Sequence, residues 1–180
     1  MNSKLALAST LLVVSTSGVT VASAQVAPPT WRYHHGLTVE AGIGIGSFRG
    51  SDVPALRGGQ QGLAGPDLGV GWFINRRLAL GLRVSGVYHR AATGDFLSES
   101  FAGPSAQVWL TPYAWLGAGA GVGMAYDGGR AFGFALDGRI GLVFNRNTRH
   151  SINAALELSP TFAGDNIYTG FALVAGYQLL

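Results

Sequence analysis

Six ionisable residues stand within runs of alternating apolar and small or polar residues. They are Glu40, Asp67, Arg83, Asp137, Arg139 and Glu157. Alternate residues of a β-strand point to opposite faces, so all six would share the face opposite to their Leu, Val, Ile and Phe neighbours. Arg binds carboxylates through two parallel hydrogen bonds, which makes an ion-pair network the expected chemistry. The predicted network contains Glu40, Arg83, Asp137, Arg139 and Glu157. Asp67 falls nearer to the outer half, so its membership of the network is left open.

Evidence for a catalytic site is weaker. His89 is the candidate base for a hydrolase, with Asp95, Ser98, Glu99 and Ser100 following it in the chain. A nucleophile and its base must come within hydrogen-bonding distance, and sequence spacing does not establish that. We therefore predict no catalytic residue and no enzymatic activity.

Two further motifs could hold a cofactor or a metal ion. The stretch GAGAGVG (117–123) has phosphate-loop spacing only with Val122 in the third glycine position. A dinucleotide site also needs a helix amino terminus, whereas strand-like alternation and a DGG turn follow here. His34 and His35 are adjacent, so they would point in opposite directions on an extended segment. The sequence predicts no cofactor and no metal site.

The composition restricts the class of protein that could carry these residues. The 180 residues are 48% hydrophobic and 12% charged, with 28 glycines and no cysteine. Disordered chains are poor in apolar residues, which excludes disorder, and the glycines have no collagen period. A disulfide scaffold is excluded by the absence of cysteine. Beyond the first residues, no apolar run reaches the ~18 residues of a membrane-spanning helix.

The first residues have the pattern of a secretory signal peptide. Lys4 precedes the apolar run of residues 5–14, and the triplet Ala22-Ser23-Ala24 supplies a small-residue cleavage site. We predict a signal peptide at 1–24, a periplasmic lead-in at 25–36 and one domain at 37–180. Without Lys4 the chain has 11 Arg against 9 Asp and Glu. That near balance, without a clustered basic face, predicts no nucleic-acid partner.

Eight runs of alternating residues follow. They span about residues 37–48, 64–74, 78–90, 101–111, 115–126, 131–144, 150–162 and 167–180. Strands of soluble proteins usually have about 5–6 residues, whereas a tilted strand needs about 9–11 to cross a bilayer. The length of these runs favours membrane-spanning strands.

The apolar face of these runs must point either into a barrel or out of it. If it pointed inward, as in a soluble lipocalin-like barrel, the water-facing surface would be mostly glycine with few charges. Soluble surfaces carry roughly 25–35% charged residues, which this face lacks. With the apolar face in lipid and small or ionisable side chains in the lumen, the pattern is that of an outer-membrane barrel. We therefore predict an all-β fold, an eight-stranded antiparallel up-and-down transmembrane β-barrel.

The connections and aromatic residues agree with this orientation. The short connections at 75–77, 111–114 and 145–149 would be periplasmic turns, and the longer ones at 49–63 and 91–100 would be extracellular loops. Outward-facing aromatics would form two interfacial girdles. These are Trp72, Phe144 and Tyr177 near the periplasmic rim, and Tyr88, Tyr126, Phe132 and Phe162 near the outer rim.

Four stretches resemble a known family. They are GLTVEAGIGIG (36–46), GWFINRRLALGLRVSG (71–86), AWLGAGAGVGMAY (114–126) and FALVAGYQLL (171–180). They are similar to the small outer-membrane β-barrel domain family, which groups with outer membrane proteins A and X. The resemblance covers residues 36–180 and implies fold, bacterial outer-membrane location and insertion by the barrel-assembly machinery. Members usually end in an aromatic residue, whereas this chain ends in Leu179-Leu180 with Tyr177 nearby.

Function is expected to reside in the lumen or in the extracellular end. The interior of an eight-stranded barrel is narrow, which favours a structural polar core over the alternative, a gated ion or proton path. Four arginines near the outer rim could bind lipopolysaccharide phosphates. These are Arg49, Arg57, Arg90 and Arg130. We expect a monomer with a structural or surface-interaction role; the alternatives are a small-solute channel and, less favoured, a lipid-modifying hydrolase.

Overall fold

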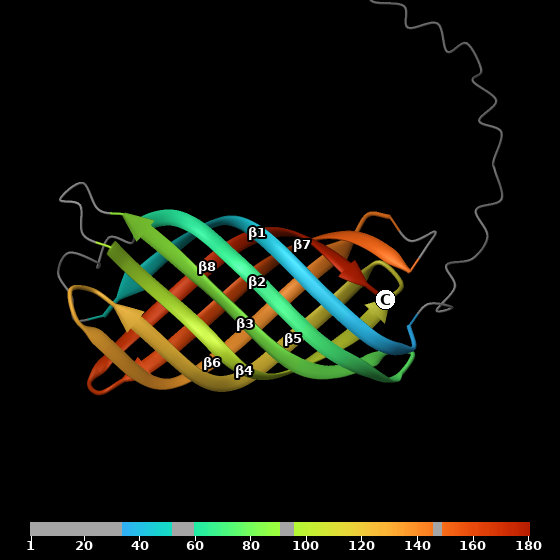
Figure 1. Cartoon of the computed structure of the whole chain (residues 1–180), viewed down its shortest axis with the longest axis horizontal. Coiled ribbons are helices and arrows are strands. Elements are labelled where there is room, and N and C mark those ends of the chain that lie inside the picture. Colours follow the sequence, from blue (N-terminus) through green and yellow to red (C-terminus); the bar gives the residue numbers. More distant parts are fainter. Residues whose placement is uncertain (1–33, 52–59, 91–95, 146–148) are drawn as a thin grey trace, which may run out of the picture.

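The computed structural model describes residues 34–51, 60–90, 96–145 and 149–180, which form a closed β-barrel (Figure 1). Its strands are β1 (Gly36–Gly50), β2 (Gln60–Asn75), β3 (Leu78–Arg90), β4 (Phe96–Thr111), β5 (Ala114–Tyr126), β6 (Arg130–Val143), β7 (His150–Ala163) and β8 (Asn166–Leu179). Each strand pairs antiparallel with its sequence neighbours, and β8 pairs with β1 to close the sheet. The predicted eight-stranded up-and-down barrel is confirmed. The predicted signal peptide at 1–24 lies outside the described residues.

The described residues contain no helix long and apolar enough to cross a bilayer.

Two strands begin earlier than the alternation of side chains predicted. β2 begins at Gln60 instead of at about residue 64, and β4 begins at Phe96 instead of at about residue 101. The added residues pair through the backbone, which does not require alternating side chains; for example, Val87 pairs with Glu99. The two outer connections therefore span 51–59 and 91–95, and are shorter than the predicted 49–63 and 91–100.

A β-bulge in β2 determines which of its side chains face the lumen. Ile43 of β1 stands opposite both Gly65 and Pro66, because Gly42 pairs with Asp67 and Gly44 pairs with Ala64. Gly65 has φ +108°, a conformation that residues with a side chain rarely adopt. The extra residue resets the alternation, so Ala64 and Asp67 are both buried in the lumen.

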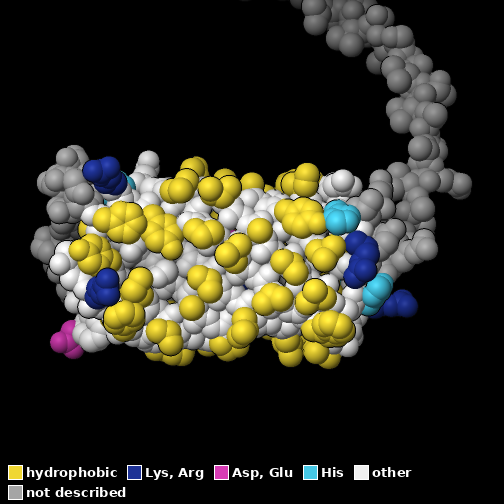
Figure 2. Space-filling view, viewed as in Figure 1, with side chains coloured by type: hydrophobic (Ala, Val, Ile, Leu, Met, Phe, Trp, Pro, Cys, Tyr) yellow, Lys and Arg dark blue, Asp and Glu magenta, His cyan; other side chains and the backbone are white. Residues whose placement is uncertain are grey.

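The apolar face of the strands points outward, as predicted. Leu82 is 62% exposed, whereas the next residue, Arg83, is 2% exposed. On the face drawn in Figure 2, hydrophobic side chains cover the middle of the barrel, and charged side chains lie at its two ends. The predicted girdles are confirmed at both rims, where Trp72 and Phe144 are exposed near one end and Phe132 and Phe162 near the other. This outer surface matches the hydrocarbon core of a membrane.

The lumen differs from the prediction that small or ionisable side chains would fill it. Two clusters of apolar side chains, named here the periplasmic plug and the outer plug, close its ends. The periplasmic plug consists of Phe73, Ala79, Trp109, Trp115, Val143, Ala155 and Leu180. The outer plug consists of Phe48, Ala64, Val87, Ala125, Ala163, Tyr168, Ala172 and Val174. Alternation could not reveal these clusters, because near the strand ends both faces carry apolar residues, as in Val108-Trp109-Leu110.

The periplasmic plug depends on a glycine beneath one of its tryptophans. A Cβ atom added to Gly141 of β6 would collide with the Trp115 ring, which is fully buried. We expect Gly141→Ala to lower the free energy of unfolding by about 1–3 kcal/mol, because an overpacked core must shift. The measurement is urea unfolding in lipid vesicles, followed by the gel mobility of the folded barrel.

A matched control lies three residues away on the same strand. A Cβ atom on Gly138 would meet a single atom, the carbonyl oxygen of Leu158, at 3.8 Å. Gly138→Ala should therefore change the free energy of unfolding by less than about 0.5 kcal/mol. Equal losses of unfolding free energy for Gly141→Ala and Gly138→Ala would contradict the explanation that Gly141 makes room for the Trp115 ring.

The polar lumen as candidate functional site

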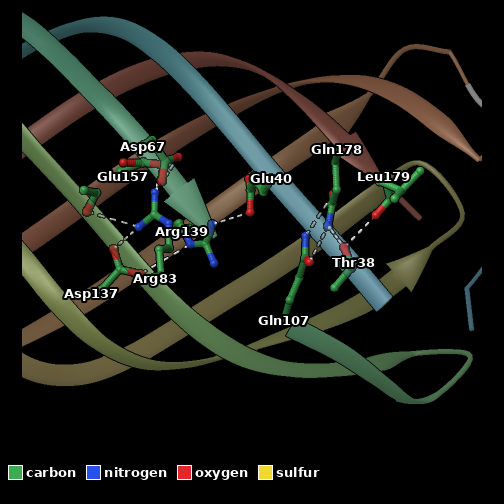
Figure 3. Close-up of polar contacts among 11 residues, drawn as sticks. Thr38, Glu40, Asp67, Arg83, Gln107, Asp137, Arg139, Glu157, Gln178 and Leu179 are labelled. Carbon is green, nitrogen blue, oxygen red and sulfur yellow. Dashed lines mark hydrogen bonds and ion pairs between the residues drawn. The ribbon is translucent and has the colours of Figure 1, made fainter. Parts of the chain in front are cut away.

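A layer of six charged side chains crosses the lumen between the two plugs (Figure 3). Five different strands supply them: Glu40 from β1, Asp67 from β2, Arg83 from β3, Asp137 and Arg139 from β6, and Glu157 from β7. All six residues are at most 7% exposed. The structure thus brings together the five residues of the predicted network, and adds Asp67 to them.

Arg83 is the centre of this charged layer. Its guanidinium lies 2.6 Å from Asp67 Oδ2 and 2.8 Å from Asp137 Oδ1, and it also forms an ion pair with Glu157. It donates a further hydrogen bond to Ser85 Oγ at 3.3 Å. Asp67, whose membership of the network the sequence left open, belongs to it, because its inward-facing carboxylate forms an ion pair with Arg83. One guanidinium therefore holds three carboxylates from three strands.

Arg139 forms the second centre of the charged layer. Its Nη1 donates to Glu40 Oε2 at 3.0 Å, and its Nε lies 3.3 Å from Asp137 Oδ2. The guanidinium carbon is 5.1 Å from the centre of the Trp115 ring, within the range of a cation–π contact. Gly117 on β5 leaves room for this side chain, because a Cβ atom there would lie 2.9 Å from Arg139 Nε. Asp137 accepts a hydrogen bond from Arg83 and forms an ion pair with Arg139, and so joins the two centres.

An amide layer separates the charged layer from the periplasmic plug. Gln178 Nε2 donates to Gln107 Oε1 at 2.8 Å and to Thr38 Oγ1 at 3.2 Å. Thr38 Oγ1 in turn donates to the carbonyl oxygen of Leu179 at 2.7 Å. These side chains face inward as the alternation predicted, but their mutual hydrogen bonds could not be read from the sequence.

Glu99 forms a separate polar group on the outer side of the charged layer. Ser159 Oγ and Thr161 Oγ1 each donate to its carboxylate at 2.8 Å. The prediction that Glu99 lies in an extracellular loop beside His89 was wrong, because β4 begins before it. His89 Nδ1 instead contacts the carbonyl oxygen of Gln61. Within the described residues, no hydrogen bond joins His89 to Glu99.

Two small cavities remain within the described lumen. One, of about 30 Å³, is lined among others by Glu40, Gln107 and Arg139, and one of about 10 Å³ is lined by Ser85, Glu157 and Ser159 among others. Such volumes suit one or two water molecules beside polar partners. Neither has room for a permeating solute.

The lead-in contributes one side chain to the periplasmic end. His34 is buried and its ring lies 5.1 Å from Phe73 and 4.2 Å from Trp109, measured between ring centres. Its Nδ1 lies 2.9 Å from the carbonyl oxygen of Arg76. His35, by contrast, is exposed. His34 therefore covers the periplasmic plug.

Comparison with known proteins bears on the fold. No family model matches the chain, and no curated protein matches its sequence. Among solved structures, Neisserial surface protein A has a TM-score of 0.64 at 17% identity, covering 79% of this chain and 96% of the other. Ail, the attachment invasion locus protein of Yersinia pestis, has a TM-score of 0.53 at 20% identity, covering 80% and 99%. This chain has the fold of the small outer-membrane β-barrels.

The outer rim of this outer-membrane barrel carries the predicted lipopolysaccharide residues. Arg49, Arg90 and Arg130 are exposed at the outer ends of β1, β3 and β6, and Arg57 lies outside the described residues. The alternation puts each of the three on the lipid-facing side of its strand. The structure therefore places three of the four arginines where a membrane headgroup would lie.

A groove runs along the outer surface of the outer-membrane barrel below Arg49. It has a volume of about 330 Å³ and is lined by Ile45, Gly46, Ser47, Gln61, Gly62, Phe171 and Leu173. Ser47 pairs with Gln61 on one side and with Phe171 on the other, and its short side chain leaves the hollow between them. The groove is thus apolar at its base and polar toward the rim.

Proposed function

We propose that this protein is a closed-lumen barrel of the bacterial outer membrane that acts through its extracellular end, in a structural or surface-interaction role. The observation that carries this proposal is the filled lumen, in which two apolar plugs enclose the charged and amide layers. A solute would have to displace Trp109 and Trp115 at one end and Phe48 and Tyr168 at the other. Those four side chains are at most 3% exposed.

The rival function is a small-solute or ion channel, and conductance separates the two. We expect the purified barrel in a planar lipid bilayer to give no steady single-channel openings. The physical reason is that an eight-stranded barrel has an interior just wide enough for its own side chains. Steady openings of reproducible size would refute the closed lumen.

Lipopolysaccharide is the partner that we propose for the outer rim. Arg grips phosphate groups well, and the exposed Arg49, Arg90 and Arg130 lie where the apolar belt ends. The groove below Arg49 has room for part of an acyl chain, and its lining residues Ile45, Phe171 and Leu173 are apolar. The combination of a cation above an apolar groove suits the phosphate and acyl chain of one lipid A molecule.

We expect replacement of Arg49, Arg57, Arg90 and Arg130 by Gln to lower lipopolysaccharide co-purification by more than about tenfold, since each of the four rim cations contributes about 1 kcal/mol of attraction to an anionic surface. The measurement is lipopolysaccharide per barrel after gentle detergent extraction. The same four positions changed to Lys serve as the control, because Lys keeps the charge. Unchanged co-purification in the Gln variant would count against this partner.

Lipid modification is the less favoured alternative. We propose that the barrel has no hydrolytic activity, since Glu99 is engaged by Ser159 and Thr161 and not by His89. Lipid A mass spectra from cells with and without the gene should then be identical.

We also expect the protein to be a monomer, which cross-linking in membranes tests. We expect the barrel-assembly machinery to insert it, which depletion of that machinery tests.

A further inference from the structure

The carboxylates of this sequence are distributed unevenly along the barrel axis. The sequence has nine Asp and Glu residues. Five of them are buried in the lumen: Glu40, Asp67, Glu99, Asp137 and Glu157. Asp127 and Asp165 lie in the outer turns, and Asp52 and Asp95, which are outside the described residues, belong to the two connections at that same end. The turns at the periplasmic end therefore contain no acidic residue.

The arginines have a different distribution. The outer end has Arg49, Arg57, Arg90 and Arg130, which match its four aspartates in number. At the periplasmic end, the β2–β3 turn contains Arg76 and Arg77, and Arg149 precedes β7; all three are exposed. In the view of Figure 2, acidic side chains appear only at the outer end, whereas Arg and His side chains line the periplasmic end. The turns of the periplasmic end thus carry arginines but no Asp or Glu.

The β2–β3 turn holds its two arginines at the boundary of the apolar belt. Trp72 and Ile74 face lipid just before the turn, and they are 57% and 60% exposed. Asn75 Oδ1 accepts hydrogen bonds from the backbone N–H groups of Arg77 at 2.8 Å and Leu78 at 3.0 Å. The side chain of Asn75 therefore stabilises a tight turn that keeps Arg76 and Arg77 next to the lipid-facing surface.

The β6–β7 side of the barrel repeats this arrangement. Phe144 is 67% exposed at the end of the apolar belt, and Arg149 follows within the same connection. Arg149 Nε donates to the carbonyl oxygen of Leu180 at 3.1 Å, which holds this side chain at the rim. The neighbouring His150 contacts the hydroxyl of the girdle residue Tyr177. On both sides of the barrel, a cation follows an outward-facing aromatic residue by a few positions.

We propose that Arg76, Arg77 and Arg149 form a binding surface for the phosphates of anionic glycerophospholipids in the periplasmic leaflet. Aromatic belts and flanking cations mark the headgroup level of a membrane, and guanidinium groups bind phosphate with paired hydrogen bonds. A lipid fits better than a periplasmic polymer, because the arginines adjoin residues that face hydrocarbon. This surface is at the opposite end from the proposed lipopolysaccharide contacts and does not depend on them.

The test uses the full-length barrel reconstituted in vesicles of equimolar phosphatidylglycerol and phosphatidylcholine. After mild detergent extraction, mass spectrometry gives the ratio of the two lipids that remain bound. We expect the wild-type protein to retain an excess of phosphatidylglycerol that falls at least about threefold in the Arg76→Gln/Arg77→Gln/Arg149→Gln variant and falls as salt is raised. Gel mobility before and after heating establishes that each variant is folded.

Two matched variants locate the effect. The Lys triple variant, with the same three positions changed to Lys, should keep the enrichment, because the contact is with an anionic headgroup. The apolar-belt variant Leu82→Ala should keep it as well, because Leu82 is exposed to lipid but carries no charge. If the Arg76→Gln/Arg77→Gln/Arg149→Gln variant does not fold, the proposal is tested by whether the phosphatidylglycerol enrichment of the wild-type and Lys proteins falls as salt is raised.

The proposal is overturned if the wild-type barrel shows no enrichment, if the enrichment is insensitive to salt, or if Leu82→Ala loses as much of it as the Arg76→Gln/Arg77→Gln/Arg149→Gln variant. Co-sedimentation with insoluble peptidoglycan gives a further decisive outcome. If the Gln triple variant loses binding to peptidoglycan while its lipid ratio is unchanged, the partner is a polymer and the lipid assignment is wrong.

Discussion

Replacing Arg83 by Met should lower the free energy of unfolding by about 3–5 kcal/mol, the cost expected when one partner of a buried ion pair is removed. Arg83 alone bonds to three carboxylates, those of Asp67, Asp137 and Glu157, and its side chain is 1% exposed. Without the guanidinium these groups would remain buried and close together without a positive charge. Urea unfolding in lipid vesicles, read by gel mobility, measures the loss as a shift of the midpoint at constant slope.

Two comparisons separate this effect from a general effect of losing an arginine. Arg130→Met at the exposed outer rim should change the free energy of unfolding by less than about 0.5 kcal/mol. Adding Asp67→Asn and Glu157→Gln to Arg83→Met should recover part of the loss, because fewer charges then stay unpaired. An unchanged midpoint for Arg83→Met, or a triple variant less stable than Arg83→Met itself, would contradict the assigned role of the network.

Replacing Trp115 by Ala should lower the free energy of unfolding by about 3–5 kcal/mol, the range for removing a buried aromatic side chain. Trp115 is 0% exposed, fills the space above Gly141 and adjoins the Arg139 guanidinium. Its removal leaves a cavity beside a charged group that loses its cation–π contact. The same urea unfolding assay in lipid vesicles measures the effect.

Trp72→Ala is the matched control for the loss of an indole ring. Trp72 is 57% exposed on the lipid side, so acyl chains can fill the space left by its ring. The loss should therefore be clearly smaller than for Trp115, since no cavity is formed. Equal losses of unfolding free energy for Trp115→Ala and Trp72→Ala would contradict the claim that packing in the lumen stabilises the barrel more than contact with lipid does.

These two predictions concern different ways of closing one lumen. Arg83 acts through charge, because it joins β2, β3, β6 and β7 across the barrel axis. Trp115 acts through volume, because its ring fills the space between Gly141 and the Arg139 guanidinium at the periplasmic end. A barrel closed in both ways serves as a rigid support for its two rims, and these rims are where the proposed lipid contacts lie.

Most of the fold could be predicted from the sequence. Strict alternation over long runs identified all eight strands, and the scarcity of charge on the glycine-rich face showed which side must meet lipid. The strand beginnings at Gln60 and Phe96 were missed, because ladder pairing there depends on backbone hydrogen bonds while the side chains no longer alternate clearly. The displaced beginning of β4 also led to the wrong placement of Glu99.

The candidate site was predicted only in part. Alternation determines which residues enter the lumen, and the structure brings the inward-facing Glu40, Arg83, Asp137, Arg139 and Glu157 together there. It could not determine at which height each side chain lies, because height depends on the stagger between strands and on the bulge at Gly65. Stagger brings Asp67 to Arg83, and it brings Glu99 to Ser159 and Thr161.

By itself, the sequence determined the number of strands, the direction of the apolar face and the placement of every acid away from the periplasmic turns. These properties follow from residue type and from a period of two, which are local. The tertiary structure alone decided which charges pair, that aromatic plugs close both ends, and that a groove lies beneath Arg49. Those properties arise when eight strands close around one axis, because closure brings residues up to 141 positions apart into hydrogen-bonding contact.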